Sequence, residues 1–161
     1  MARCSKRVSI SLDGPPVVEP FVIQPDDKGR FTLGVESSEI ETRFEQRAKK
    51  ENALGHVYLT NWTRPDDIPT WNFTVPKAGR YKVEISYGAT RAGNDKAFLV
   101  SIGDKSVSGK TIETGNDWVF QSHQLGTLNL QAGAQTLQVK SATTQGLGGV
   151  TLERVKLVPQ P

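Results

Sequence analysis

Residues 76–85 read PKAGRYKVEI, and residues 131–140 read QAGAQTLQVK. Each stretch begins with an Ala-Gly turn and continues with alternating apolar and polar residues. Tyr81, Val83 and Ile85 share one face of the first stretch, and Leu137 and Val139 share one face of the second. A period of two over a short run that follows a glycine turn indicates a half-buried antiparallel strand.

The same alternation recurs at short intervals along the chain. It is found in residues 31–35, 71–75, 98–102, 125–130, 136–140 and 150–158, with further candidates at 40–44, 107–112 and 118–120. No stretch of about ten residues has the periodicity of a helix. About nine or ten short strands separated by turn signals predict an all-β fold, a sandwich of two antiparallel sheets. We expect long loops at residues 45–70, 88–96 and 141–149, with a helical turn or loop at 45–53.

Composition excludes several classes of function. The chain has 161 residues, enough for one domain with a core, and a net charge of +3. Basic residues are scattered among acidic ones without an aromatic-lined stripe, so we expect no nucleic-acid partner. No run approaches the ~18 apolar residues of a membrane helix, so no membrane partner is expected either. Cys4 is the single cysteine, which rules out an intrachain disulfide.

The N-terminal region differs from the rest of the chain. Val8, Ile10 and Leu12 alternate and predict a short strand, which ends at the breaker DGPP in residues 13–16. We therefore divide the chain into residues 1–28, a strand remnant and linker, and residues 29–161, the β-sandwich. Residues 1–20 lack the apolar core of a signal peptide.

Five segments in a fixed order resemble a known family. They are WNFTVPKAGRYKVEISYG (71–88), KAFLVSIGDK (96–105), TGNDW (114–118), LGTLNLQAGAQTLQVK (125–140) and VTLERVKLVP (150–159). This order resembles carbohydrate-binding modules of the family 6 and family 35 type, over roughly residues 31–159. It is also similar to the β-sandwich domain at the C-terminus of many bacterial α-L-fucosidases and sulfatases.

The resemblance implies a jelly-roll β-sandwich that binds an oligo- or polysaccharide in a cleft of rim loops. It implies that the domain is a non-catalytic accessory module of a larger secreted or periplasmic protein, with the catalytic domain of its parent enzyme as a partner. We expect a monomer. The late loop SATTQGLGG (141–149) lacks the Asn that some family 6 modules place there, which is a departure from the usual cleft.

Aromatic residues in the predicted loops are the first candidates for sugar binding. A sugar ring has an apolar face that stacks on an exposed aromatic ring and an edge of hydroxyl groups that needs polar partners. Trp62 lies in the loop YLTNWTRPDD and Trp118 follows a Thr-Gly turn, so both are candidates together with Tyr58. The alternative is that these rings cover the core. Trp71 alternates with Phe73 and is predicted to be a core residue.

Polar candidates come from the same loops, where ordinary turn and surface roles are the alternative. The candidates are Asn61, Arg64, Asp66 and Asp67 near Trp62, Asn116 and Asp117 near Trp118, and Arg91, Asn94 and Asp95 in the loop GATRAGNDK.

The resemblance also implies a structural calcium ion near the first and last strands. Glu39 and Glu41, with Glu36 nearby, are the early acids, and Glu153 stands where the family has Asp. Oxygen ligands of this kind suit calcium, although acids at the surface are the alternative.

No residue pattern predicts catalysis. Nothing selects a pair of carboxylates for glycoside hydrolysis, and His56 and His123 lack the spacing of metal ligands. A second hypothesis from a different class is a structural or interaction domain that packs on its parent enzyme and binds no sugar.

Overall fold

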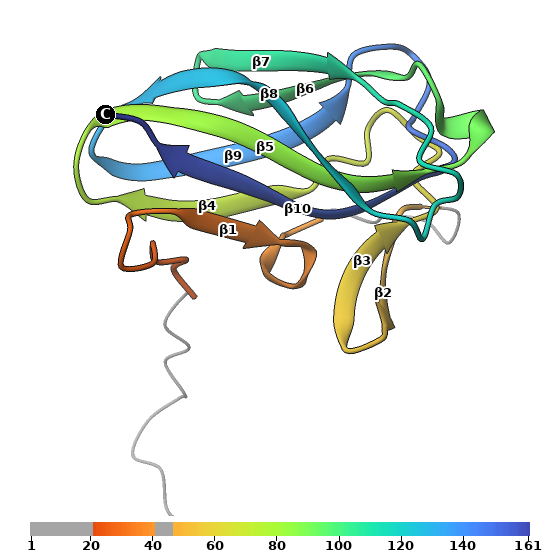
Figure 1. Cartoon of the computed structure of the whole chain (residues 1–161), viewed down its shortest axis with the longest axis horizontal. Helices are drawn as coiled ribbons and strands as arrows, with labels where there is room; N and C mark the ends of the chain where they lie inside the picture. The colour runs from red at the N-terminus through yellow and green to blue at the C-terminus, as the bar shows by residue number, and fades with distance from the viewer. Residues whose placement is uncertain (1–20, 41–46) are drawn as a thin grey trace, which may run out of the picture.

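The computed structural model describes residues 21–40 and 47–161. The predicted strand remnant in residues 1–20, most of the predicted strand at 40–44, Cys4 and Glu41 lie outside the described residues. Figure 1 shows two layers of strands packed face to face, with the C-terminus at one end of the sandwich.

Ten strands form the described fold, and two short 3₁₀ turns, Val35–Ser37 (η1) and Arg91–Gly93 (η2), accompany them. The strands are β1 (Phe31–Gly34), β2 (Lys49–Ala53), β3 (His56–Thr60), β4 (Thr70–Val75), β5 (Gly79–Ala89), β6 (Ala97–Ile102), β7 (Lys105–Lys110), β8 (Gln121–Leu130), β9 (Gly133–Ser141) and β10 (Val150–Pro159). None of these described elements is a helix long and apolar enough to span a membrane.

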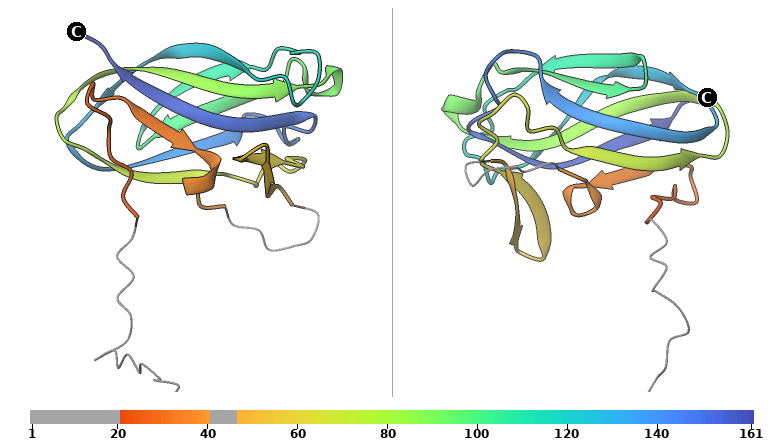
Figure 2. Two further views of the ribbon diagram at one scale, coloured as in Figure 1. Left: turned by 60° about the horizontal axis from the view of Figure 1, so that its bottom comes forward. Right: turned by 180° about the vertical axis from the view of Figure 1, so that it is seen from behind.

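The strands pair into two antiparallel sheets, which confirms the predicted all-β sandwich. The larger sheet has the order β2-β3-β10-β5-β8, and β1 also pairs with β10. The smaller sheet has the order β4-β9-β6-β7. β1 pairs with residues 154–157 of β10 and β3 with Leu152, so both lie on the same side of β10. β3 and its partner β2 thereby extend from one end of the larger sheet (Figure 2).

The core lies between the inner faces of the two sheets. Trp71 is fully buried, as predicted, and donates its indole N–H to the carbonyl of Gly34 at 2.7 Å. Phe73 meets Phe31 of the opposite sheet edge to face, with ring centroids 5.0 Å apart. Burying one such side chain stabilises the fold by about 1.5–3 kcal/mol. The alternation in residues 71–75 and 81–85 therefore identifies the faces that hold the sheets together.

Three sequence predictions need correction. Residues 45–53 and 56–60 were expected to be loop or helical turn, but they contain the β2–β3 hairpin. Ile112 and residues 118–120 were expected in strands, but they lie in the loop between β7 and β8. Ile23 is buried and pairs with Phe73 of β4, so packing on the sandwich begins before residue 29.

Candidate functional site

Three long loops gather at the end of the sandwich opposite the C-terminus (Figure 1). They are residues 61–69, 111–120 and 142–149. The first and third touch closely, since a Cβ on Gly146 would lie 2.2 Å from the carbonyl carbon of Thr63. The backbone N–H of Thr90 donates to the carbonyl of Gly149 at 2.9 Å and ties the third loop to the end of β5.

A groove of about 500 Å³ lies between these loops and the β2–β3 hairpin. Its lining is mostly polar, and one large aromatic residue belongs to it. The lining residues are Lys49, Glu51, Thr60, Asn61, Thr63, Asp117, Trp118, Gly149, Val150 and Thr151. The structure therefore brings Asn61 of one loop together with Asp117 and Trp118 of another.

A hydrogen-bonded turn holds Asp117 and Trp118 in place. The Asn116 side chain accepts the backbone N–H of Trp118 at 2.8 Å, and the Asn116 carbonyl accepts the hydroxyl of buried Thr114 at 2.9 Å. That hydroxyl in turn accepts the N–H of Ala89 in β5 at 2.9 Å. Asn116 thus shapes the turn and lies outside the residues that line the groove.

Trp118 is 44% exposed and packs against two other aromatic rings. Tyr58 and Phe120 stack on each other at 4.7 Å, and Trp118 is nearly perpendicular to both, at 5.5 and 6.4 Å. Similar distances to both rings place the indole beside the stack. The indole therefore packs in T-shaped contacts against Tyr58 and Phe120 while part of it stays exposed at the groove.

Trp62 and Tyr58 were expected to be exposed platforms, and that expectation was wrong. Trp62 is 1% exposed, and its indole N–H donates to the carbonyl of Asp67 at 2.7 Å. Tyr58 is 5% exposed, and its ring packs against the indole of Trp118. Phe120 was missed, because its position after Trp118 was interpreted as part of a strand.

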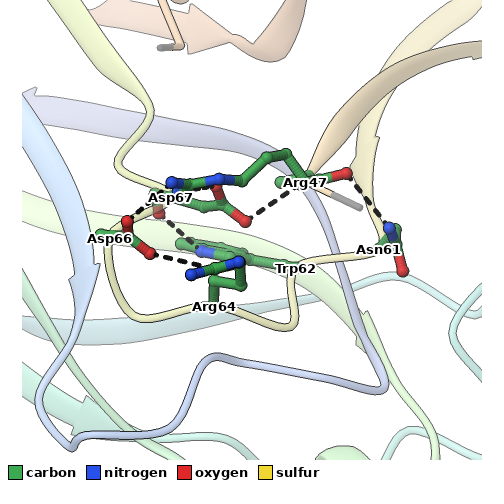
Figure 3. Close-up of polar contacts among 7 residues, drawn as sticks. Arg47, Asn61, Trp62, Arg64, Asp66 and Asp67 are labelled. Carbon is green, nitrogen blue, oxygen red and sulfur yellow. Dashed lines mark hydrogen bonds and ion pairs between the residues drawn. The ribbon is translucent and has the colours of Figure 1, made fainter. Parts of the chain in front are cut away.

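A buried ion-pair network fixes the loop that contains Trp62 (Figure 3). Asp67 was a candidate for sugar binding, but it is fully buried. Its carboxylate accepts hydrogen bonds from the Arg47 guanidinium at 2.9 Å and from the N–H of Ala48 at 3.0 Å. The Asn61 side chain donates to the carbonyl of Arg47 at 3.1 Å. Asp67 is therefore a structural residue of the loop.

Asp66 completes this network at the surface. Arg47 contacts the Asp66 carboxylate at 2.8 Å, and Arg64 approaches it at 3.5 Å. The hydrogen bond from Arg47 lowers the pKa of Asp66, and the hydrogen bond to Asp67 is the main cause that raises the pKa of Arg47. Arg64 is exposed on the loop but does not line the groove.

The remaining polar candidates lie away from the groove. Arg91 is exposed in η2. The Asn94 side chain accepts the backbone N–H of Glu113 at 2.9 Å, and Asp95 pairs with Lys110 at 2.9 Å. None of these three residues lines the groove, so the structure does not bring Arg91 and Asn94 together with Trp118.

The predicted calcium ligands are not assembled in the described part of the chain. No three His, Cys, Asp or Glu side chains of residues 21–40 and 47–161 are grouped as metal ligands would be. Glu153 accepts the hydroxyl of Ser86 at 2.5 Å and pairs with Arg154 at 3.0 Å, while Glu39 is exposed. Since Glu41 lies outside the described residues, calcium binding stays a prediction.

A larger groove of about 1140 Å³ lies elsewhere, along the edge of β4. It includes exposed Phe21 and Val22 together with Glu36, Glu39 and polar residues of β4 and β9. It is separate from the three loops, and no residue of the candidate groove belongs to it.

The architecture defined by these two sheets is that of carbohydrate-binding modules. The family 35 carbohydrate-binding module from Clostridium thermocellum matches with a TM-score of 0.66 at 17% identity, over 81% of this chain and 98% of the module. A family 6 module from Cellvibrio mixtus lichenase 5A, solved in complex with cellotriose, matches with a TM-score of 0.61 at 15% identity, over 81% of this chain and 97% of the module.

The chain also matches part of a larger enzyme. The GH26-CBM35 β-(1,4)-mannanase of Podospora anserina matches with a TM-score of 0.66 at 19% identity, over 83% of this chain but only 28% of the mannanase. By sequence, no family model and no curated protein matches. At these identities the likeness establishes the fold.

Proposed function

We propose that this domain binds carbohydrate without catalysis, as an accessory module of a glycan-degrading enzyme. The structural neighbours support the proposal, since one was solved with cellotriose and another is part of a mannanase. A module of this kind would act as part of a larger secreted or periplasmic protein, and would raise the local concentration of its parent enzyme at a glycan.

The observation that carries the proposal is the orientation of Trp118. Its ring is supported on one side by Tyr58 and Phe120 and is partly exposed, at the wall of a polar groove. The C–H face of a pyranose ring can stack on the free side, while the amide of Asn61, the carboxylate of Asp117 and nearby hydroxyl groups meet its hydroxyl edge. The supporting stack holds the ring in one orientation before a ligand arrives, which reduces the entropy lost on binding.

A glycan array with the intact chain tests the proposal, followed by titration calorimetry on the glycans that bind. Trp118→Ala should weaken binding by at least about tenfold, as expected for the loss of a central aromatic contact. Ile112→Ala is a matched control, because Ile112 is an exposed apolar residue of the same loop that does not line the groove. Equal affinities of Trp118→Ala and wild type would reject this site.

The groove along β4 favours a second candidate function, a domain that packs on its parent enzyme. Phe21 is 79% exposed beside this groove, and an exposed apolar surface of this kind suits a protein partner. In that case the intact chain would bind no member of the array, and Phe21→Ala would weaken its association with the parent catalytic domain.

A further inference from the structure

Among the described residues, the charged side chains that line the candidate groove are one lysine and two carboxylates, which leaves one negative charge in excess. The chain as a whole has a net charge of +3. The groove is therefore locally opposite in sign to the rest of the molecule. A ligand in contact with these groups experiences the local charges more strongly than distant ones, because salt screens the latter.

The one lysine among the described lining residues already has a partner. Lys49 and Glu51 lie two residues apart on β2, with the ammonium and carboxylate 3.8 Å apart. Two nearby cations, Arg47 just before β2 and Arg64 in the loop of residues 61–69, both contact Asp66, and Arg47 also contacts Asp67. These four charges balance one another.

Asp117 has no such partner. Within residues 21–40 and 47–161, its carboxylate makes no hydrogen bond or ion pair, although its neighbour Asn116 is fully engaged in the turn. Asp117 and Trp118 are consecutive residues of that turn and line the same groove. A ligand that enters the groove would therefore meet both a carboxylate and an indole ring.

This pair of groups discriminates ligands by charge. A uronate or sulfate beside an unpaired carboxylate would be repelled. An ammonium group would gain both the carboxylate and the electron-rich indole face. A neutral sugar needs only the hydrogen-bond acceptors and the stacking surface, so it is accepted without a charge preference.

We propose that the groove selects glycans by charge: it binds neutral glycans, binds glycans with free amino groups more tightly, and rejects those with carboxylate or sulfate groups. This inference rests on the proposed function, since it concerns the same groove and the same Trp118.

The experiment compares matched probes on the intact chain. Oligomers of β-1,4-linked glucose, glucosamine and glucuronate share ring and linkage and differ in charge, and a glycan array supplies equivalent sets on other backbones. In any set that binds, we expect affinity to fall in the order amine, neutral, uronate. Asp117→Asn should lower the ratio of amine to neutral affinity by about two- to fivefold. Asp104→Asn makes the same charge change in the β6–β7 turn, outside the groove, and should leave the ratio as in wild type.

The outcomes separate the two proposals. Binding of a uronate or sulfated glycan as tightly as its neutral parent overturns the charge selection alone. An unchanged affinity ratio in Asp117→Asn does the same, provided that Trp118→Ala still abolishes binding. If wild type binds no member of the array, the proposed function fails and the charge selection fails with it.

Discussion

Trp62 and Trp118 have different roles because their rings meet different surroundings. Trp62 lies inside the loop of residues 61–67 and donates its N–H to Asp67, so it serves the fold. Trp118 packs against Tyr58 and Phe120 and keeps part of its ring exposed. A loop tryptophan can therefore act as a ligand platform only where the protein itself leaves part of the ring uncovered.

We therefore expect Trp62→Ala to reduce the free energy of unfolding by about 3–5 kcal/mol, because it removes a fully buried ring and leaves a cavity. Urea unfolding monitored by circular dichroism measures this loss. The matched variant is Trp118→Ala, which should cost less than about 1 kcal/mol since its ring is partly exposed. Similar losses in the two variants would contradict the division of roles.

At the scale of elements, the β2–β3 hairpin forms one wall of the groove and has an unusual turn. Leu54 and Gly55 connect the strands, and both have positive φ, at 53° and 80°. Two-residue hairpin loops with positive φ at both positions favour Asn-Gly. A leucine at the first position is strained, because its Cβ crowds the backbone in the left-handed region.

Leu54→Asn should accordingly raise the stability of the protein by about 0.5–1 kcal/mol, as the strain at φ 53° is relieved. The midpoint of urea unfolding is a suitable measurement. Leu54→Ala is the control, since it also removes the exposed apolar side chain but lacks the amide group whose local hydrogen bonds let Asn adopt positive φ. An equal gain in stability in both variants would mean that the effect comes from removing the exposed apolar side chain and not from relieving backbone strain.

At the scale of the whole molecule, the groove exists because loops distant in sequence pack against each other. Gly146 approaches the backbone of Thr63 so closely that no side chain fits between them. A Cβ added to Gly148, in the same loop, would make only an ordinary contact with the Thr63 methyl group at 3.8 Å. One glycine is therefore required by packing between loops, and the other is not.

Gly146→Ala should destabilise the fold by about 1–3 kcal/mol and weaken glycan binding, because the added methyl group separates the two loops. Gly148→Ala provides the matched control and should behave nearly as wild type. Thermal unfolding and calorimetric titration together report both effects. If Gly146→Ala has the stability and the glycan affinity of wild type, the close contact between the two loops is required for neither property.

Strand positions were predictable because burial of one sheet face imposes a period of two on the local sequence. This held for residues 71–75 and 81–85, whose apolar side chains are all buried, and for the alternating Phe98, Val100 and Ile102. It failed for β2, whose residues KKENA belong to an edge strand that buries little and so carries no alternation. Trp118, Asn61 and Asp117 were also found from sequence, through their residue types and their loops.

The sequence by itself determined the all-β class and the faces that form the core, since both follow from interactions between a residue and its neighbours two positions away. Only the tertiary structure decided which loop residues line the groove. Trp62 and Asp67 look as available as Trp118 in the chain, but the Asp67 carboxylate pairs with Arg47, 20 residues away, and the Asp67 carbonyl accepts the indole N–H of buried Trp62. Exposure in a loop depends on partners that are far away in sequence, so local pattern does not encode it.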